Sequence, residues 1–143
     1  VQGYATDVDE AVIQQARFGT YTTHEVRGVP SDLLEKYFES TNRGYVFHAA
    51  LRRRVIFGRH HLAEDAPMSK IDLLICRNVL IYLKPDTQAS ILVRFHFALK
   101  NTGFLFLGKA EALTLHRKIF TPLDFRHRIY TKGLALNLED HLS

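Results

Sequence analysis

Several residue types are scarce in this chain, and each scarcity excludes a class of protein. Tryptophan is absent and cysteine occurs once among 143 residues. A single thiol cannot form a disulfide within the chain, so a small secreted disulfide scaffold is excluded and a cytoplasmic location is expected. There is no run of eighteen apolar residues and no basic stretch followed by an apolar one near residue 1. We therefore expect neither membrane insertion nor secretion.

The motifs of several enzyme classes are also missing. The chain contains no nucleophile elbow, phosphate-binding glycine loop or metalloprotease helix. None of its eight histidines are spaced four residues apart, and the adjacent His60 and His61 would point to opposite sides of an extended chain. We therefore expect no metal site. Cys76 lies inside an apolar run, where burial reduces thiol reactivity, so it is expected in the core.

Positive charge is in modest excess. The formal net charge is +4, and the basic residues are scattered apart from two groups, Arg52–Arg54 and Arg126–Arg128. No aromatic-basic strand signature accompanies them, so nucleic-acid binding stays open only as a third hypothesis and we expect no nucleic-acid partner. An acidic protein partner or an anionic cofactor accounts for the same charge at least as well.

The hydrophobic pattern predicts one α/β domain. Strands and helices are expected to alternate, in a three-layer sheet with a hairpin-like return. A small β excursion is expected at residues 40–57, and residues 133–143 form a tail without a predicted role. The predicted elements are strands at 1–6, 71–76, 104–107 and 128–131 and helices beginning at Asp9, Pro30 and Pro85, the first of them ending at Gly19.

Two positions carry candidate chemistry. The run Leu73–Leu83 predicts a strand buried on both faces, and Arg77 and Asn78 interrupt it where that strand should end. Burying this pair beside leucine costs several kcal/mol unless both find partners, so they are expected to face the ligand crevice at the carboxyl ends of the strands. Asp7 also follows a strand, where it could accept hydrogen bonds from a ribose or cap the next helix.

Five segments together resemble the catalytic domain of the chemotaxis receptor methyltransferase (CheR) family. The most specific is the string Cys-Arg-Asn-Val-Leu-Ile-Tyr, and Phe95–Leu99 is most similar to members fused into larger sensory proteins. The segments are Ala5–Asp9, Val55–Leu62, Ile71–Tyr82, Phe104–Gly108 and Arg128–Tyr130.

The resemblance implies a Rossmann-like methyltransferase domain over residues 1–132 that uses S-adenosylmethionine, with S-adenosylhomocysteine as product. The substrates implied are glutamate side chains of chemoreceptors or other signalling proteins, and the small β insertion is implied to contact them. By the same resemblance, Asp7 holds the ribose, His61 and Leu62 flank the adenine, Arg77 and Asn78 line the cofactor pocket, and Tyr82 lies near the transferred methyl group.

One departure from the family limits these expectations. The first strand and its glycine-rich loop have no counterpart in residues 1–143. The chain is therefore expected to be an incomplete, inactive portion that binds the cofactor weakly. The missing strand would leave two inner strand edges open to intermolecular pairing. The alternative is a non-catalytic, degenerate methyltransferase domain that serves as a protein-interaction module.

Overall fold

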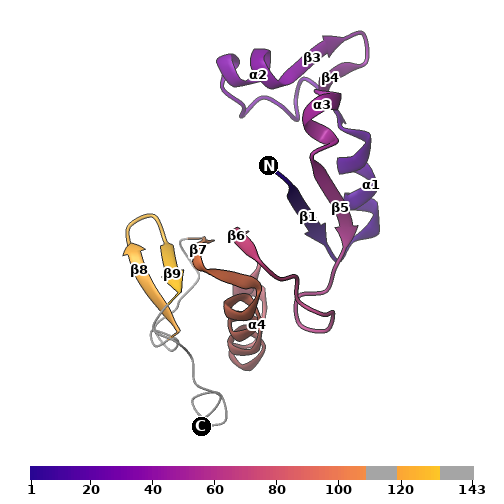
Figure 1. The fold of residues 1–143 in the computed structure, drawn as a ribbon. Coiled ribbons are helices and arrows are strands. Elements are labelled where there is room, and N and C mark those ends of the chain that lie inside the picture. Colours follow the sequence, from indigo (N-terminus) through magenta and orange to yellow (C-terminus); the bar gives the residue numbers. More distant parts are fainter. Residues whose placement is uncertain (109–118, 133–143) are drawn as a thin grey trace. The chain divides into compact units, whose positions relative to one another are not determined.

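A computed structural model describes residues 1–108 and 119–132 of the chain (Figure 1). The chain divides into two compact units, Val1–His61 and Leu62–Ser143, and each is described by itself. The elements of the first unit are β1 (Gly3–Asp7), α1 (Glu10–Phe18), β2 (Thr20–Tyr21), α2 (Ser31–Tyr37), β3 (Phe38–Thr41), β4 (Gly44–Phe47), α3 (Ala49–Arg52) and β5 (Val55–Arg59).

The first unit is built on a parallel pair of strands. β1 and β5 pair in register from Gly3 opposite Val55 to Asp7 opposite Arg59, and α1 packs against both strands. The helix begins as predicted, because the Asp9 side chain accepts from the Ala11 N–H at 2.9 Å. It ends at Gly19, whose φ of 66° lies in the left-handed region that glycine adopts without strain.

The apolar face of α1 is narrow. Helical spacing in the sequence predicts four inward-facing side chains, of which Ile13 is buried and Ala16 half-buried, while Ala11 and Val12 are exposed. Only one stripe of the helix faces the two-stranded sheet, so four apolar residues cannot all reach it.

A small antiparallel sheet forms in the order β2-β4-β3. The β excursion was expected at residues 40–57, yet its strands lie between Thr20 and Phe47, because the run at 55–59 pairs with β1 instead. β3 begins at Phe38, two residues before the expected excursion. Aromatic contacts favour this strand, since the Phe38 ring lies edge-to-face with Phe47 at 5.3 Å and with Tyr21 at 6.2 Å.

The second unit contains a mixed sheet in the order β6-β7-β9-β8, parallel between β6 and β7 and antiparallel elsewhere. Its elements are β6 (Ile71–Cys76), a 3₁₀ turn η1 (Leu80–Tyr82), α4 (Pro85–Ala98), β7 (Leu99–Leu107), β8 (Phe120–Asp124) and β9 (Ile129–Lys132). The core of this unit is one cluster that joins α4 to one face of the sheet and includes Cys76, Ile91, Leu92, Leu105 and Phe120. The α/β class is thus confirmed, as are the first-turn position of Pro85 and the hairpin-like return.

The prediction that the strand at 71–76 is buried on both faces is wrong for this structure. Leu73 and Ile75 are 54% and 61% exposed, because the core of this unit lies on the other face of the sheet. Phe104, the register partner of Leu73 on β7, is exposed as well, whereas Phe106, the partner of Ile75, is half-buried. β7 also begins five residues earlier than predicted, since Leu99 is buried in the core and pairs with Ile71.

Three further expectations from the sequence concern membrane spans, the C-terminal tail and the layers of the sheet. Among residues 1–108 and 119–132, no helix is long and apolar enough to span a membrane. The expected tail at 133–143 lies outside the described residues. The three-layer arrangement of the sheet remains a prediction, since each unit by itself shows one sheet face covered by a helix.

Candidate functional site

The end of β1 presents a carboxylate in a fixed orientation. Asp7 Oδ1 accepts from the Asp9 N–H at 2.9 Å, and the Asp7 carbonyl accepts from the His60 N–H at 3.0 Å. Asp9, not Asp7, caps the helix. The Asp7 side chain is exposed, and its second oxygen makes no hydrogen bond to a described residue. One oxygen thus holds the turn, while the other can accept from a ligand hydroxyl.

A residue that the sequence did not single out supports this turn. Arg59, at the end of β5, stands opposite Asp7 in the strand pairing and donates from Nε to the Val8 carbonyl at 3.1 Å. The turn after β1 is therefore tied to the end of β5 by a side chain as well as by the His60 backbone. The spacing Asp7-x-Asp9 is a sequence signal for this turn, because an aspartate often binds the backbone two residues on.

In the second unit, the residues after β6 leave the sheet through a strained backbone. Asn78 has a φ of 59°, in the left-handed region, where asparagine is tolerated better than most residues. The Arg77 guanidinium lies over the Phe106 ring, 4.8 Å from its centroid. This cation–π contact gives Arg77 an aromatic partner. Both Arg77 and Asn78 are solvent-exposed.

Tyr82 and Leu62 differ in how they are presented. Leu80 is buried in the core and anchors η1, which leaves Tyr82 81% exposed. The Leu62 side chain packs against the core cluster, and its carbonyl accepts from Arg94 Nε at 2.9 Å. An exposed phenol can reach a ligand without rearrangement, whereas the Leu62 side chain is already engaged.

The predicted cofactor residues are divided between the units. Asp7 and the exposed His61 belong to the first unit, whereas the second carries Leu62, Arg77, Asn78 and Tyr82. Among the described residues, no group of three or more histidine, cysteine, aspartate or glutamate side chains could hold a metal ion. The individual roles of the six residues remain predictions.

The basic group Arg52–Arg54 is partly used to hold the fold together. Arg52 Nη1 donates to the Phe18 carbonyl at 3.2 Å, at the C-terminal end of α1. A positive charge at the C-terminal end of a helix interacts favourably with the helix dipole. Arg53 and Arg54 are exposed.

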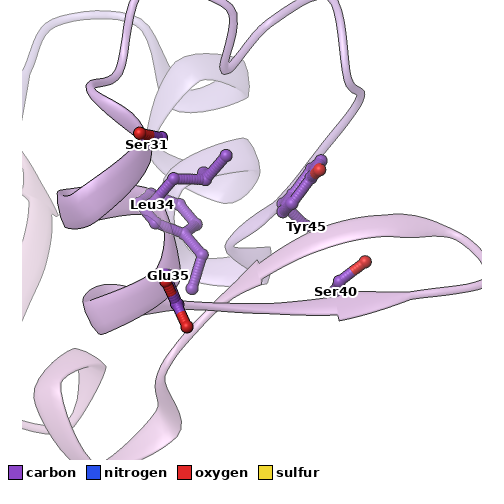
Figure 2. A pocket seen from close by; sticks show the side chains of 6 residues that line it. Ser31, Leu34, Glu35, Ser40 and Tyr45 are labelled. Atoms are coloured by element: carbon purple, nitrogen blue, oxygen red, sulfur yellow. The ribbon is translucent and has the colours of Figure 1, made fainter.

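A pocket of about 290 Å³ lies between α2 and the small sheet (Figure 2). Its lining combines apolar side chains with one carboxylate: Ser31, Leu34, Glu35, Phe38, Ser40 and Tyr45. No sequence pattern predicted it, because the pocket depends on how α2 folds back on β3 and β4.

Two carboxylates outside the predicted cofactor residues have a lowered pKa. The Thr22 N–H donates to Glu25 at 2.9 Å and lowers the pKa of that carboxyl group. The Glu25 N–H donates in return to Thr22 Oγ1, a reciprocal pattern signalled by Thr-x-x-Glu in the sequence. Hydrogen bonds from the His127 side chain and backbone lower the pKa of Asp124.

Comparison with known proteins places the chain in a family. The family described as CheR methyltransferase, SAM binding domain, matches residues 1–129. The chain is 37% identical over 127 residues to an uncharacterized 104.1 kDa protein of Rhodobacter capsulatus, covering 89% of this chain and 13% of that protein.

Two further relatives have functional names. Chemotaxis protein methyltransferase 1 of Pseudomonas aeruginosa is 39% identical over 79% of this chain and 42% of its own length. Chemotaxis protein methyltransferase Cher2 of Pseudomonas putida is 37% identical over 76% of this chain and 41% of its own length. The chain thus spans about two-fifths of these two relatives. It belongs to the CheR methyltransferase family, whose SAM-binding domain takes S-adenosylmethionine as cofactor.

Proposed function

We propose that the chain is part of a protein-glutamate O-methyltransferase that modifies chemoreceptors or related signalling proteins in the cytoplasm. The family match over residues 1–129 and the names of the relatives support this reaction. The observation that carries it is the Asp7 carboxylate, exposed at the carboxyl end of a parallel strand and oriented by the Asp9 N–H at 2.9 Å. Ligands of open α/β sheets bind at such strand ends.

We propose roles for six residues in holding an adenosine-containing cofactor. Asp7 would accept from the ribose hydroxyls, while His61 and Leu62 would flank the adenine. Arg77 and Asn78 would line the pocket, and the exposed Tyr82 would lie beside the transferred methyl. The left-handed backbone of Asn78 is consistent with such a role, because strained residues concentrate at functional sites.

The chemistry asks little of the protein beyond positioning. When bound, the cofactor supplies a methyl carbon already activated by its sulfonium. A glutamate side chain has an ordinary pKa of about 4.3, so it is ionised near neutral pH and needs no general base. Holding two reactants in line can contribute about 7–11 kcal/mol to the rate. The chain's own contribution would therefore be to bind and orient.

We further propose that the two units are parts of one Rossmann-like domain over residues 1–132, with the cofactor site incomplete in this chain. Within the described residues, β1 pairs only with β5 and β6 only with β7. Each strand therefore has a free edge where a further strand could pair. Calorimetric titration should find weak or no cofactor binding by residues 1–143 alone, and micromolar affinity would contradict this proposal.

The decisive test of the reaction uses the full-length protein. Incubation with methyl-labelled cofactor and a glutamate-rich receptor segment should give a base-labile methyl ester on glutamate. The Asp7→Asn variant should transfer methyl groups more slowly at low cofactor concentration, while Asp9→Asn, which keeps the helix cap, should not. Binding of the segment without any methyl transfer would favour the non-catalytic interaction module instead.

A further inference from the structure

Several basic residues that the proposed cofactor site does not use lie at one edge of the four-stranded sheet, the edge formed by the carboxyl ends of β6 and β7. Cys76 and Leu107, the last residues of β6 and β7, stand side by side in the register. The Leu107 N–H donates to the Arg128 carbonyl at 3.0 Å. The turn that joins β8 to β9 (Figure 1) therefore lies at the end of the sheet where β6 and β7 finish. Arg77 and Asn78 follow β6 at this same edge.

This turn, Phe125–Arg128, is called the basic turn below. Phe125 is 58% exposed, and Arg126 and His127 are exposed as well. The Arg128 guanidinium lies over the Phe125 ring, 4.4 Å from its centroid, and Nη1 donates to the Phe125 carbonyl at 3.4 Å. Asp124, the last residue of β8, is engaged by His127, with 2.8 Å between Oδ2 and Nδ1.

Arg128, in the basic turn, has two features that are unfavourable for folding. Arg128 has a φ of 58°, where glycine or asparagine would meet less strain. Its Nε is buried and makes no hydrogen bond to any residue that the structure describes. Strained backbone concentrates at functional sites, and a buried donor without a partner calls for an explanation such as a bound ligand.

We infer that the basic turn is a docking surface for an acidic, glutamate-bearing segment of a protein. The charges are complementary, since the exposed Arg126 and the half-buried Arg128 lie in this turn. The carboxylate of Asp124 is paired with His127. The exposed Phe125 and Leu123 side chains offer apolar contact to the aliphatic part of a glutamate side chain. This inference deepens the proposed function and rests on it, because it names how that substrate is recognised.

The binding test uses the full-length protein and a fluorescent, glutamate-rich helical peptide. In fluorescence anisotropy, Arg126→Gln should weaken peptide binding about three-fold, as expected for one exposed charge pair, and should reduce its salt dependence. The matched control is Lys70→Gln, which removes the same charge just before β6, at the opposite edge of the sheet. Lys70→Gln should leave the affinity unchanged.

Three results would overturn the inference. The first is an equal effect of Arg126→Gln and Lys70→Gln. The second is equal binding of a peptide with glutamine in place of every glutamate. The third is competition of equal strength by a DNA strand of the same charge, which would mark a general polyanion surface.

A kinetic measurement separates this inference from the proposed function. In the methyl-transfer assay, Arg126→Gln should raise KM for the peptide and leave kcat and cofactor affinity unchanged. Methyl transfer with an unchanged KM would refute the docking surface and leave the reaction standing. Arg126-dependent peptide binding without methyl transfer would do the reverse.

Discussion

At the scale of single residues, two aspartates separated by one position have different roles. Asp9 caps α1, whereas Asp7 accepts from the Asp9 N–H and keeps one oxygen available. From the sequence, ribose binding and helix capping were both open for Asp7. The structure assigns the cap to Asp9, so capping no longer competes with the proposed ribose role of Asp7.

Substitution of Asp7 should therefore affect cofactor binding, and substitution of Asp9 should affect stability. In the full-length protein, Asp7→Asn should weaken cofactor binding at least ten-fold, since a hydrogen bond to a charged group contributes about 1.5–3 kcal/mol. It should leave thermal stability nearly unchanged, because the asparagine oxygen can still accept from the Asp9 N–H. Asp9→Ala should instead lower the free energy of unfolding by about 1 kcal/mol. Calorimetry and urea unfolding measure the two effects, and a stability loss in Asp7→Asn as large as that in Asp9→Ala would contradict this assignment.

Asp124 gives the second residue-scale prediction. Its pKa is lowered from the usual 3.8, first by the His127 side chain. The ionised carboxylate therefore stabilises the fold above that usual value, and the contribution is lost as the pH falls through the lower folded-state pKa. Urea unfolding should find Asp124→Asn less stable than the parent at about pH 6, with the difference disappearing toward about pH 2. A difference independent of pH would contradict the carboxylate's role.

At the scale of elements, turns depend on two glycines with positive φ. Gly19 has a φ of 66°, and a Cβ there would lie 2.8 Å from the flexible end of Arg52. Gly44 has a φ of 122°, and its Cβ would meet the Tyr21 carbonyl oxygen in the neighbouring strand β2. A side-chain tip can move aside, but the backbone of a paired strand cannot move without breaking the small sheet.

Alanine substitutions at three glycines should therefore lower the free energy of unfolding by different amounts. Gly19→Ala should lower the free energy of unfolding by about 1–2 kcal/mol through left-handed strain. Gly44→Ala should cost about 3 kcal/mol or more, because strain adds to the clash. Gly28→Ala is the matched control, with no atom within 4 Å of the added Cβ, and should be nearly neutral. Urea unfolding would test this order, and equal costs at Gly19 and Gly44 would refute the account.

The two faces of the four-stranded sheet give another element-scale prediction. Leu105 is fully buried on the core face, whereas Leu73 is 54% exposed on the other. Leu105→Ala should cost about 2–5 kcal/mol through lost transfer energy and a cavity. Leu73→Ala should cost less than about 1 kcal/mol, since its side chain removes little area from water in this unit. Similar costs in the full-length protein would mean that another segment covers Leu73.

At the scale of the whole molecule, the free edge of β6 could pair with a strand of a second copy of the chain. The edge strand β8 carries Pro122, which cannot donate to a further strand, but β6 has neither proline nor lysine. We expect residues 1–143 to self-associate with rising concentration in analytical ultracentrifugation. Ile75→Lys should reduce this association. The control is Ile56→Lys on β5, where the isoleucine is 52% exposed against 61% for Ile75. Equal effects of both variants would argue against pairing at β6.

Local signals predicted a large part of the fold. The Asp9 cap, the Gly19 stop, the Pro85 start and the strand Ile71–Cys76 all appear in the structure. Such signals act over a few residues, so one sequence suffices to read them. The string from Cys76 to Tyr82 likewise indicated the family that the comparisons show.

The remaining features depend on contacts between distant segments. Pairing of β5 with β1 decides that residues 55–59 leave the small sheet, and the position of the core decides which face of β6 is exposed. The hydrogen bond from Leu107 to Arg128 brings the basic turn to the edge that carries Arg77. The sequence by itself determined the local elements and the family. Only the tertiary structure decided which edges and faces they share, because strand pairing joins residues whose spacing along the chain carries no local signal.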